Sequence, residues 1–275
     1  MSALETWTLE SIIAVGGMAE VWCARRGSEI VALKRLHSHL ARNPELRDQF
    51  VTEQQLARAL PRHPHLVHAV DAGKLDELPY VALELAPGED LRRYLAPPVK
   101  HERSDARAAV ARPVLSRTQR IAIAIAACEA AAHLHAHGYV HGDINPGNLV
   151  VEPAQRGVVL VDLGIARSIQ RGAGGAVRGT HAYMAPEQVK AGAWTPATDV
   201  FALGVVLWEL IAGARLFHRG PTWLSMAAVV EDAAPPLADP ELDAIAQAAL
   251  EKDPARRTAS ARALAAQLSD QLNLS

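Results

Sequence analysis

The sequence predicts an α+β fold with two lobes, a small N-terminal lobe of strands followed by a larger, mainly helical lobe. Residues 7–36 alternate apolar and polar side chains, and Gly16-Gly17 and Gly27-Ser28 interrupt them, as in antiparallel strands joined by tight turns. After Pro87-Gly88 the chain changes to long Ala- and Leu-rich segments typical of helices. We therefore expect an N-lobe of residues 1–86 and a C-lobe of residues 87–275 within one domain.

Each expected element follows from a local pattern. We expect the N-lobe to contain five strands and one helix. Three strands fill residues 7–36, the helix covers 44–60 between prolines, and two short apolar runs give strands at 66–72 and 79–85. The expected helices of the C-lobe are 116–137, 199–213, 240–251 and 258–272. The polar segment between Pro97 and Pro113 is expected to be an exposed loop.

Composition limits the classes of function. Of the 275 residues 49% are hydrophobic and 21% charged, which is ordinary for a globular protein, and the net charge of −2 gives no reason to expect a nucleic acid partner. The apolar runs at 121–132 and 200–213 are shorter than the roughly 20 residues that span a bilayer. The first residues do not form a signal peptide, and Cys23 and Cys128 are expected to be reduced thiols. These features predict a cytoplasmic protein of undetermined oligomeric state.

Four separated motifs carry the chemistry. They are Ala14-Val15-Gly16-Gly17-Met18-Ala19-Glu20-Val21, Val31-Ala32-Leu33-Lys34, His141-Gly142-Asp143-Ile144-Asn145-Pro146-Gly147-Asn148 and Val161-Asp162-Leu163-Gly164. Lys34 ends an apolar strand, where its charge needs a partner. The third motif has the composition of a turn, but it lies between an expected helix and the apolar run Leu149-Val150-Val151.

In this order and spacing, the motifs resemble those of protein kinase domains of the bacterial, eukaryotic-like Ser/Thr type, and the resemblance covers residues 7–268. It implies transfer of the γ-phosphate of ATP to Ser or Thr hydroxyls of a protein substrate, with Mg²⁺ as the metal. The implied catalytic residues are Lys34, Glu53, Asp143 and Asn145. The implied metal ligands are Asn148 and Asp162.

The resemblance also assigns the nucleotide site. Glycines in a hairpin allow backbone N–H groups to approach phosphate oxygens. The implied ATP-binding residues are Ala14, Val15, Gly16, Gly17, Met18, Val21, Ala32, Lys34, Glu84, Ala86 and Val150. An ordinary hairpin turn is the alternative for the first motif, and plain core packing explains Val21, Ala32 and Val150 equally well.

Three further residues match scaffold positions of the family. Glu187 ends the segment Gly179–Glu187, which resembles the peptide-docking segment, and Arg257 resembles the arginine that pairs with that glutamate. Asp199 resembles the helix-start carboxylate that holds the backbone of the catalytic loop.

The sequence departs from the family twice in the catalytic loop. Gly142 replaces an arginine, and Asn145 replaces a lysine that in Ser/Thr kinases touches the γ-phosphate. An amide brings no charge to a transferring phosphoryl group, so two alternatives stay open: a regulatory pseudokinase and a small-molecule alcohol phosphotransferase. The loss of the arginine also predicts that phosphorylation of the segment 162–187 does not switch the enzyme.

Overall fold

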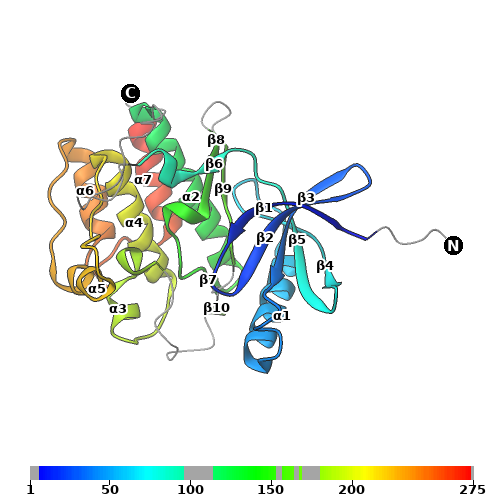
Figure 1. The fold of residues 1–275 in the computed structure, drawn as a ribbon. Coiled ribbons are helices and arrows are strands. Elements are labelled where there is room, and N and C mark those ends of the chain that lie inside the picture. Colours follow the sequence, from blue (N-terminus) through cyan, green and yellow to red (C-terminus); the bar gives the residue numbers. More distant parts are fainter. Residues whose placement is uncertain (1–5, 96–113, 153–156, 164–166, 169–179, 274–275) are drawn as a thin grey trace, which may run out of the picture. The chain divides into compact units, whose positions relative to one another are not determined.

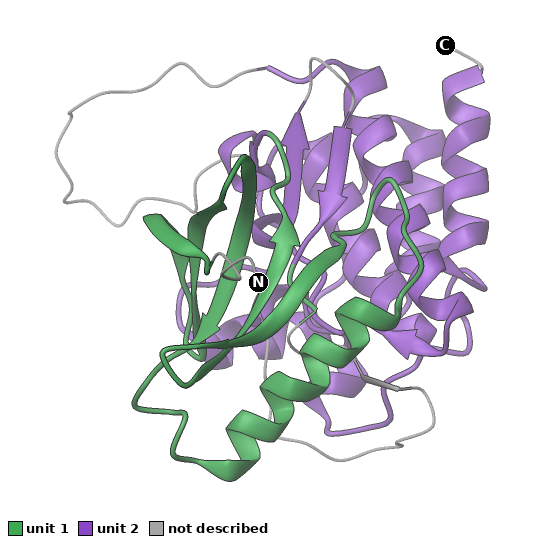
Figure 2. Ribbon diagram, turned by 90° about the vertical axis from the view of Figure 1, so that its right-hand side faces the viewer, with its two compact units in different colours: residues 1–87, 162–164 green, residues 88–161, 165–275 purple. Residues whose placement is uncertain are grey.

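The computed structural model describes residues 6–95, 114–152, 157–163, 167–168 and 180–273 (Figure 1). The chain forms two compact units, residues 1–87 with 162–164, and residues 88–161 with 165–275 (Figure 2). The expected loop at 97–113 lies outside the described residues.

Unit 1 contains a five-stranded antiparallel sheet in the order β1-β2-β3-β5-β4. The strands are β1 (Thr8–Val15), β2 (Ala19–Arg26), β3 (Glu29–Leu36), β4 (Ala69–Leu75) and β5 (Leu78–Glu84). The expected N-lobe architecture is therefore confirmed. The fourth strand begins three residues later than its apolar run, because its residue pairing with β5 starts at Ala69, while Leu66 forms an isolated antiparallel bridge with His63.

Successive side chains of β3 point to opposite faces of the sheet, one packed in the apolar core and the other bearing Lys34. Val31 and Leu33 are buried with Trp7 and Ala24 on one face of the sheet. Lys34, one position further along β3, has the opposite side-chain direction. Sequence alternation thus places Lys34 on the face away from this apolar cluster.

The helix of unit 1, α1 (Pro44–Ala59), begins where the sequence predicts. The side chain of Asn43 accepts hydrogen bonds from the N–H groups of Glu45 and Leu46, and Pro44 occupies the first turn. Phe50 and Leu56 are buried on one face, together with Glu53. The helix therefore places a buried carboxylate beside these apolar side chains.

Unit 2 is mainly helical. Its helices are α2 (Arg117–Ala136), α3 (Pro186–Val189), α4 (Pro196–Ala212), α5 (Thr222–Glu231), α6 (Pro240–Ala249) and α7 (Ala261–Asn273). Short strands join them: β6 (Glu89–Asp90), β7 (Tyr139–Val140), β8 (Leu149–Glu152), β9 (Gly157–Leu160) and β10 (Arg167–Ser168). Three 3₁₀ turns, η1 (Leu91–Arg93), η2 (Pro146–Asn148) and η4 (His181–Tyr183), complete the described elements.

Helix α4 is the core helix of unit 2. Its residues from Thr198 to Leu210 are all buried, which is typical of a helix that is apolar on every side. It packs closely on α6, because a Cβ on Gly204 would lie 2.9 Å from the Cβ of Ala249. The four expected helices of this unit are present, whereas α3 and α5 were not expected, since α3 has only four residues and α5 lacks a clear polar face.

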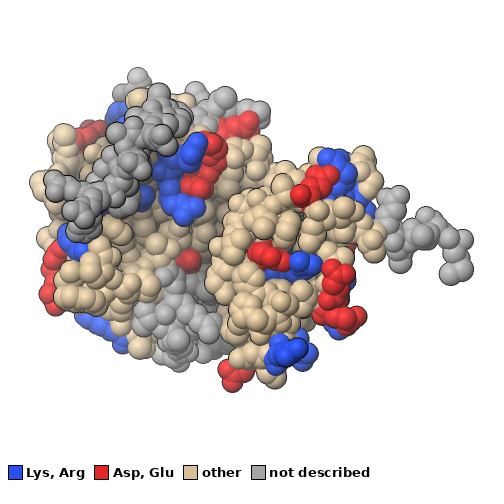
Figure 3. All heavy atoms as spheres, in the orientation of Figure 1, with Lys and Arg blue, Asp and Glu red and all other residues tan. Residues whose placement is uncertain are grey.

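The surface carries paired charges. On the face drawn in Figure 3, blue Lys and Arg groups stand beside red Asp and Glu groups. In unit 1 such pairs join Arg25 to Glu10 and Arg26 to Asp71 at 2.5 and 2.7 Å. Within the described part of the chain, no helix is long and apolar enough to cross a membrane.

Candidate active site

Lys34, Glu53 and Asp162 form a cluster of charged side chains in unit 1, with Lys34 between the two carboxylates. Its Nζ lies 2.6 Å from Glu53 Oε1 and 2.6 Å from Asp162 Oδ1. The Lys34 and Glu53 side chains are nearly buried, with 10% and 5% of their surface exposed, whereas Asp162 is 47% exposed. The expected pair between Lys34 and Glu53 is therefore present, and Asp162 joins it from the accessible side.

The charge state of this group follows from its surroundings. Burial alone would lower the pKa of Lys34, but the negative charges of Glu53 and Asp162 outweigh that effect and raise it, so the ammonium stays charged. Burial raises the pKa of Glu53 against the pull of Lys34. Among the described residues, Glu53 Oε2 is buried without a hydrogen-bond partner, so Lys34 is the group that supports this carboxylate inside the unit.

The glycine hairpin joins β1 to β2. The Gly16 N–H donates to the Ala19 carbonyl at 2.9 Å, which closes the turn. A Cβ on Gly17 would meet no atom of the described residues within 4 Å, so the backbone at this position is open with respect to them. Ala14 and Val15 are exposed, and Met18 is half-buried.

Two of the implied ATP-binding residues lie close to Lys34 in the sheet. Val21 lies directly opposite Lys34 in the β2–β3 pair, and Ala32 precedes Lys34 by two positions on the same face of β3. Both side chains are half-buried. Register thus brings Val21, Ala32 and Lys34 to one patch of the sheet.

The remaining implied nucleotide-binding residues lie at strand ends. Glu84 ends β5, where its N–H donates to the His68 carbonyl at 2.9 Å, and Ala86 follows it half-buried. Val150 belongs to β8 of unit 2, where it is half-buried and paired with Val159 and Asp90.

The catalytic loop of unit 2 is fixed by Asp199. This fully buried carboxylate accepts the N–H groups of His141 and Gly142, each at 2.8 Å, and lies 2.8 Å from His135 Nε2. Burial would raise the pKa of Asp199, but the hydrogen bond from His135 and the neighbouring donors lower it. The ionised carboxylate therefore holds the loop backbone as the family resemblance predicts.

The Asp143 carboxylate accepts several hydrogen bonds from N–H groups of unit 2. Its Oδ1 accepts the N–H of Thr180 at 2.9 Å and Asn145 Nδ2 at 3.1 Å, and its Oδ2 accepts Asn148 Nδ2 at 3.3 Å. These contacts fix the direction of the carboxylate while the side chain stays half-buried rather than enclosed.

Asn145 and Asn148 both use their amide nitrogens on Asp143. Asn145 is 6% exposed, and its Oδ1 accepts the Gly147 N–H at 2.8 Å. The nitrogen and the oxygen of this amide therefore both form hydrogen bonds within the loop. Asn148 Nδ2 also donates to the Asp143 carbonyl at 2.9 Å. That orientation leaves the amide oxygen of Asn148 as its ligand atom, a hard oxygen of the kind Mg²⁺ prefers.

The position of Gly142 explains why no arginine stands there. Gly142 has a φ of 76°, in the left-handed region, and a Cβ at this residue would lie 2.4 Å from Trp194 Cζ3. The Gly142 carbonyl accepts Gln188 Nε2 at 2.8 Å. The loop therefore depends on glycine for both its backbone conformation and the place of the Trp194 ring.

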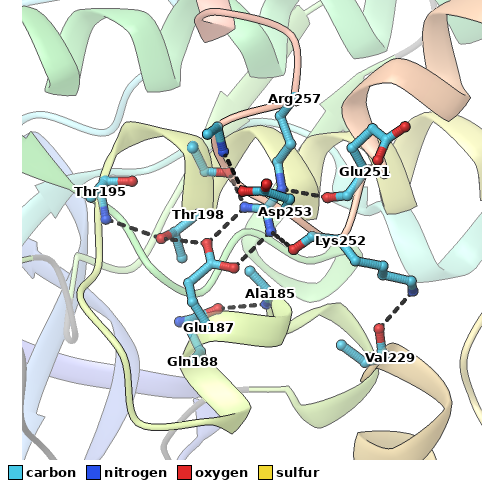
Figure 4. Close-up of polar contacts among 12 residues, drawn as sticks. Ala185, Glu187, Gln188, Thr195, Thr198, Val229, Glu251, Lys252, Asp253 and Arg257 are labelled. Atoms are coloured by element: carbon cyan, nitrogen blue, oxygen red, sulfur yellow. Dashed lines mark hydrogen bonds and ion pairs between the residues drawn. The ribbon is translucent and has the colours of Figure 1, made fainter. Parts of the chain in front are cut away.

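Glu187 and Arg257 form the expected scaffold pair (Figure 4). Arg257 Nη1 and Nη2 each lie 2.7 Å from one oxygen of Glu187, and the arginine side chain is fully buried. Arg257 also donates to the carbonyls of Ala197, Glu251 and Lys252. The pair thus ties α3 to the start of α4 and to the loop after α6.

Sequence reasoning missed two contributors to this loop. His135 contacts Asp199 from 64 residues away, and the Trp194 ring lies against Gly142 from 52 residues away. His135 stands in a histidine-rich helix end, but no local pattern distinguishes it from His133 and His137. Only the packing of α2 against α4 reveals its role.

A five-stranded antiparallel sheet bearing a Lys–Glu pair and a helical unit bearing an anchored Asp–Asn loop define a protein kinase domain. The chain belongs to this family: the family model described as protein kinase domain matches residues 7–268.

The chain is similar to several bacterial members of the family. The chain is 34% identical over 281 residues to the serine/threonine-protein kinase PknB of Mycolicibacterium smegmatis. It is 33% identical over 280 residues to PknB of Mycobacterium leprae and 32% over 281 residues to PknB of Mycobacterium tuberculosis. Each match covers 96% of this chain and 42% of the relative, so the chain spans less than half the length of these relatives.

These findings confirm the expected family and the two-lobed kinase fold. The roles of individual site residues and the extent of the domain stay predictions.

Proposed function

We propose that this domain binds ATP with Mg²⁺ and transfers the γ-phosphoryl group to a Ser or Thr hydroxyl of a protein substrate. The observation that carries the proposal is the Asp143 carboxylate, which three N–H donors orient within a loop anchored by buried Asp199. A fixed, half-buried carboxylate is suited to receive a proton from a substrate hydroxyl.

The groups of unit 1 suit the nucleotide. The charged Lys34 ammonium supplies a cation for phosphate oxygens, and Glu53 keeps it in place. The open backbone at Gly17 leaves room for phosphate oxygens near its N–H. Val21 and Ala32 offer apolar surface on the same patch of the sheet for the adenine ring.

The proposed metal ligands fit Mg²⁺ by their chemistry. Asp162 presents a carboxylate that is 47% exposed, and Asn148 keeps its amide oxygen available because its nitrogen is used on Asp143. Mg²⁺ needs only one or two carboxylates in addition to phosphate oxygens and waters. When bound, the metal supplies positive charge against the phosphates.

The transfer step can be written with the residues of the loop. The hydroxyl oxygen of the substrate forms a bond to the γ-phosphorus, the bond from that phosphorus to the leaving oxygen of ADP breaks, and Asp143 accepts the hydroxyl proton. Asn145 acts by holding Asp143, because both ends of its amide are engaged in the loop. The charge that a lysine would contribute at position 145 is absent, so we expect slower turnover than in kinases that retain it.

The decisive experiment measures transfer of labelled phosphate from ATP to a generic protein with and without Mg²⁺. We expect transfer to Ser or Thr that requires the metal and is lost in Asp143→Asn, while nucleotide binding survives. Asp270→Asn, at an exposed carboxylate in α7, is the matched control and should transfer at the parental rate.

Binding is measured separately by thermal unfolding, since a ligand that binds only the folded state raises the unfolding temperature. A shift with ATP and Mg²⁺ but no transfer would identify a pseudokinase. Transfer to small alcohols in preference to proteins would identify the third class considered. The cytoplasmic location expected from the sequence agrees with a reaction that consumes ATP, and it stays part of this proposal.

A further inference from the structure

We infer that a pocket beside Asp143 binds a carboxylate side chain of the substrate, so that the enzyme prefers peptides with Asp or Glu near the acceptor hydroxyl. The inference rests on the proposed function, because it concerns the protein substrate of that reaction. Its principal residue is Arg92, and the evidence is the place of the pocket, the chemistry of its lining and the support of this arginine.

The pocket adjoins the proposed catalytic carboxylate. It has a volume of about 290 Å³ and lies entirely within unit 2. Asn145 and Thr180 belong to its lining, and both donate to Asp143 Oδ1, at 3.1 and 2.9 Å. An extended peptide advances roughly 3.3–3.6 Å per residue, so a substrate whose hydroxyl reaches Asp143 brings a neighbouring side chain to this pocket.

The lining is rich in nitrogen donors. Arg92, His181, Arg215 and His218 all contribute to it, and the described lining residues include no Asp or Glu. Guanidinium groups form short, charge-assisted hydrogen bonds with carboxylates. A lysine or arginine of a substrate would meet like charge here, whereas an Asp or Glu side chain would be attracted.

Arg215 is less available than its place suggests. It lies 2.9 Å from Oε2 of the fully buried Glu209 and also contacts the Tyr183 hydroxyl. Burial raises the pKa of Glu209 against the effect of Arg215, so this arginine is needed to support a costly carboxylate. The Arg215 side chain therefore stabilises buried Glu209 and is poorly placed to bind a ligand in the pocket.

Arg92 is the group best placed for a ligand. Its side chain is 62% exposed, and Asp90 orients it through two contacts, Nε to Oδ1 at 2.9 Å and Nη2 to Oδ2 at 3.1 Å. A guanidinium has five N–H donors, so this pair does not exhaust it. Asp90 also accepts the Arg92 backbone N–H at 3.0 Å, which fixes the turn that carries the side chain.

Gly147 makes room for this arrangement. A Cβ on Gly147 would lie 3.2 Å from Arg92 Cζ and 3.3 Å from Arg92 Nε, so the guanidinium rests against the catalytic loop where other residues carry a side chain. Arg92 thus brings a positive charge next to Asn145, the loop position that lost its lysine.

The test uses peptides with one Ser acceptor in which Glu or its uncharged isostere Gln is placed at each of about four positions on either side, the reach of an extended chain across the pocket. We expect kcat/KM to favour Glu over Gln at least tenfold at one or more positions, about 1.4 kcal/mol. Arg92→Met should remove this preference, and Arg92→Lys should retain part of it.

Arg93→Met is the matched control. Arg93 belongs to the same turn, is 56% exposed and pairs with Glu89, but it does not line the pocket. The preference for Glu should survive in this variant. Equal rates for Glu and Gln peptides at every position, or an unchanged preference in folded Arg92→Met, would overturn the inference.

A binding measurement separates this inference from the proposed function. Peptides with Ala in place of the acceptor Ser cannot be phosphorylated, so fluorescence anisotropy reports their affinity whether or not the domain turns over. Tighter binding of the Glu peptide, lost in Arg92→Met and weakened by salt, supports the pocket even if no transfer is detected. Transfer without any effect of Glu on rate or affinity contradicts the pocket and leaves the kinase proposal standing.

Discussion

Trp194 occupies the place of a side chain at Gly142, since a Cβ on that glycine would lie 2.4 Å from Cζ3 of the tryptophan ring. The family has an arginine where this chain has Gly142. The space beside Gly142 is filled by Trp194, which lies 52 positions further along the chain. Restoring a side chain at residue 142 without moving Trp194 requires the loop to shift.

Gly142→Ala is expected to destabilise the domain more than Gly138→Ala. Both glycines have left-handed φ values, 76° and 82°, so each alanine costs about 1–2 kcal/mol of backbone strain. Only position 142 adds a collision, because a Cβ on Gly138 meets no atom within 4 Å, and overpacking adds about 1–3 kcal/mol. Urea unfolding of the two variants measures the difference. Equal losses would contradict the role assigned to Trp194.

Phosphorylation of the segment between Asp162 and Glu187 is not expected to activate the enzyme. Gly142 has no side chain to bind a phosphate, and residues 169–179, which lie outside the described structure, contain no Ser, Thr or Tyr. Mass spectrometry of active enzyme and kinetics of Ser168→Ala test this. A stoichiometric phosphate whose removal slows the reaction tenfold, about 1.4 kcal/mol of barrier, would refute the prediction.

Glu187→Gln should lower the free energy of unfolding by about 3–5 kcal/mol, because it leaves the fully buried Arg257 without its charged partner. The neighbouring Arg256 is 71% exposed and lies 3.5 Å from Glu251, so Arg256→Ala should change stability by less than about 0.5 kcal/mol. Denaturant unfolding gives both values. A loss in the control as large as that in Glu187→Gln would mean that burial of the pair is not the cause.

Lys252 predicts a pH dependence of stability. Burial lowers its pKa to about 8, with Asp232 opposing and Arg257 adding to the shift, and its Nζ donates to the Val229 carbonyl and lies 4.3 Å from the centre of the Phe217 ring. The folded state then binds fewer protons than the unfolded state between pH 8 and the ordinary value of 10.5. This group therefore contributes stability that increases as pH rises through that range.

The comparison with Lys252→Met isolates the effect. We expect the difference in unfolding free energy between parent and variant to move in favour of the parent as pH rises from 8. Lys190→Met, at an exposed lysine, controls for the loss of one charge. A difference that is constant with pH would show that Lys252 does not titrate in this range.

The local chemistry of this protein was evident from its sequence alone. Alternation, turn glycines and a proline in the first helical turn determine β1, β2, β3 and α1, because these features act over a few residues. The resemblance to protein kinases predicted the pairs Lys34–Glu53 and Glu187–Arg257, and the structure contains both. Such pairs could be anticipated because a buried charge requires a partner.

Only the tertiary structure decided how the unusual residues are used. Asn145 looks like a weakened phosphate contact in the sequence, whereas in the fold its amide holds Asp143 and closes the turn at Gly147. Gly142 looks like a loss, whereas it accommodates Trp194. The physical reason is distance along the chain: a ring, a histidine or an arginine that packs on the loop from a remote element leaves no periodic or local trace, so its contact exists only once the units have folded.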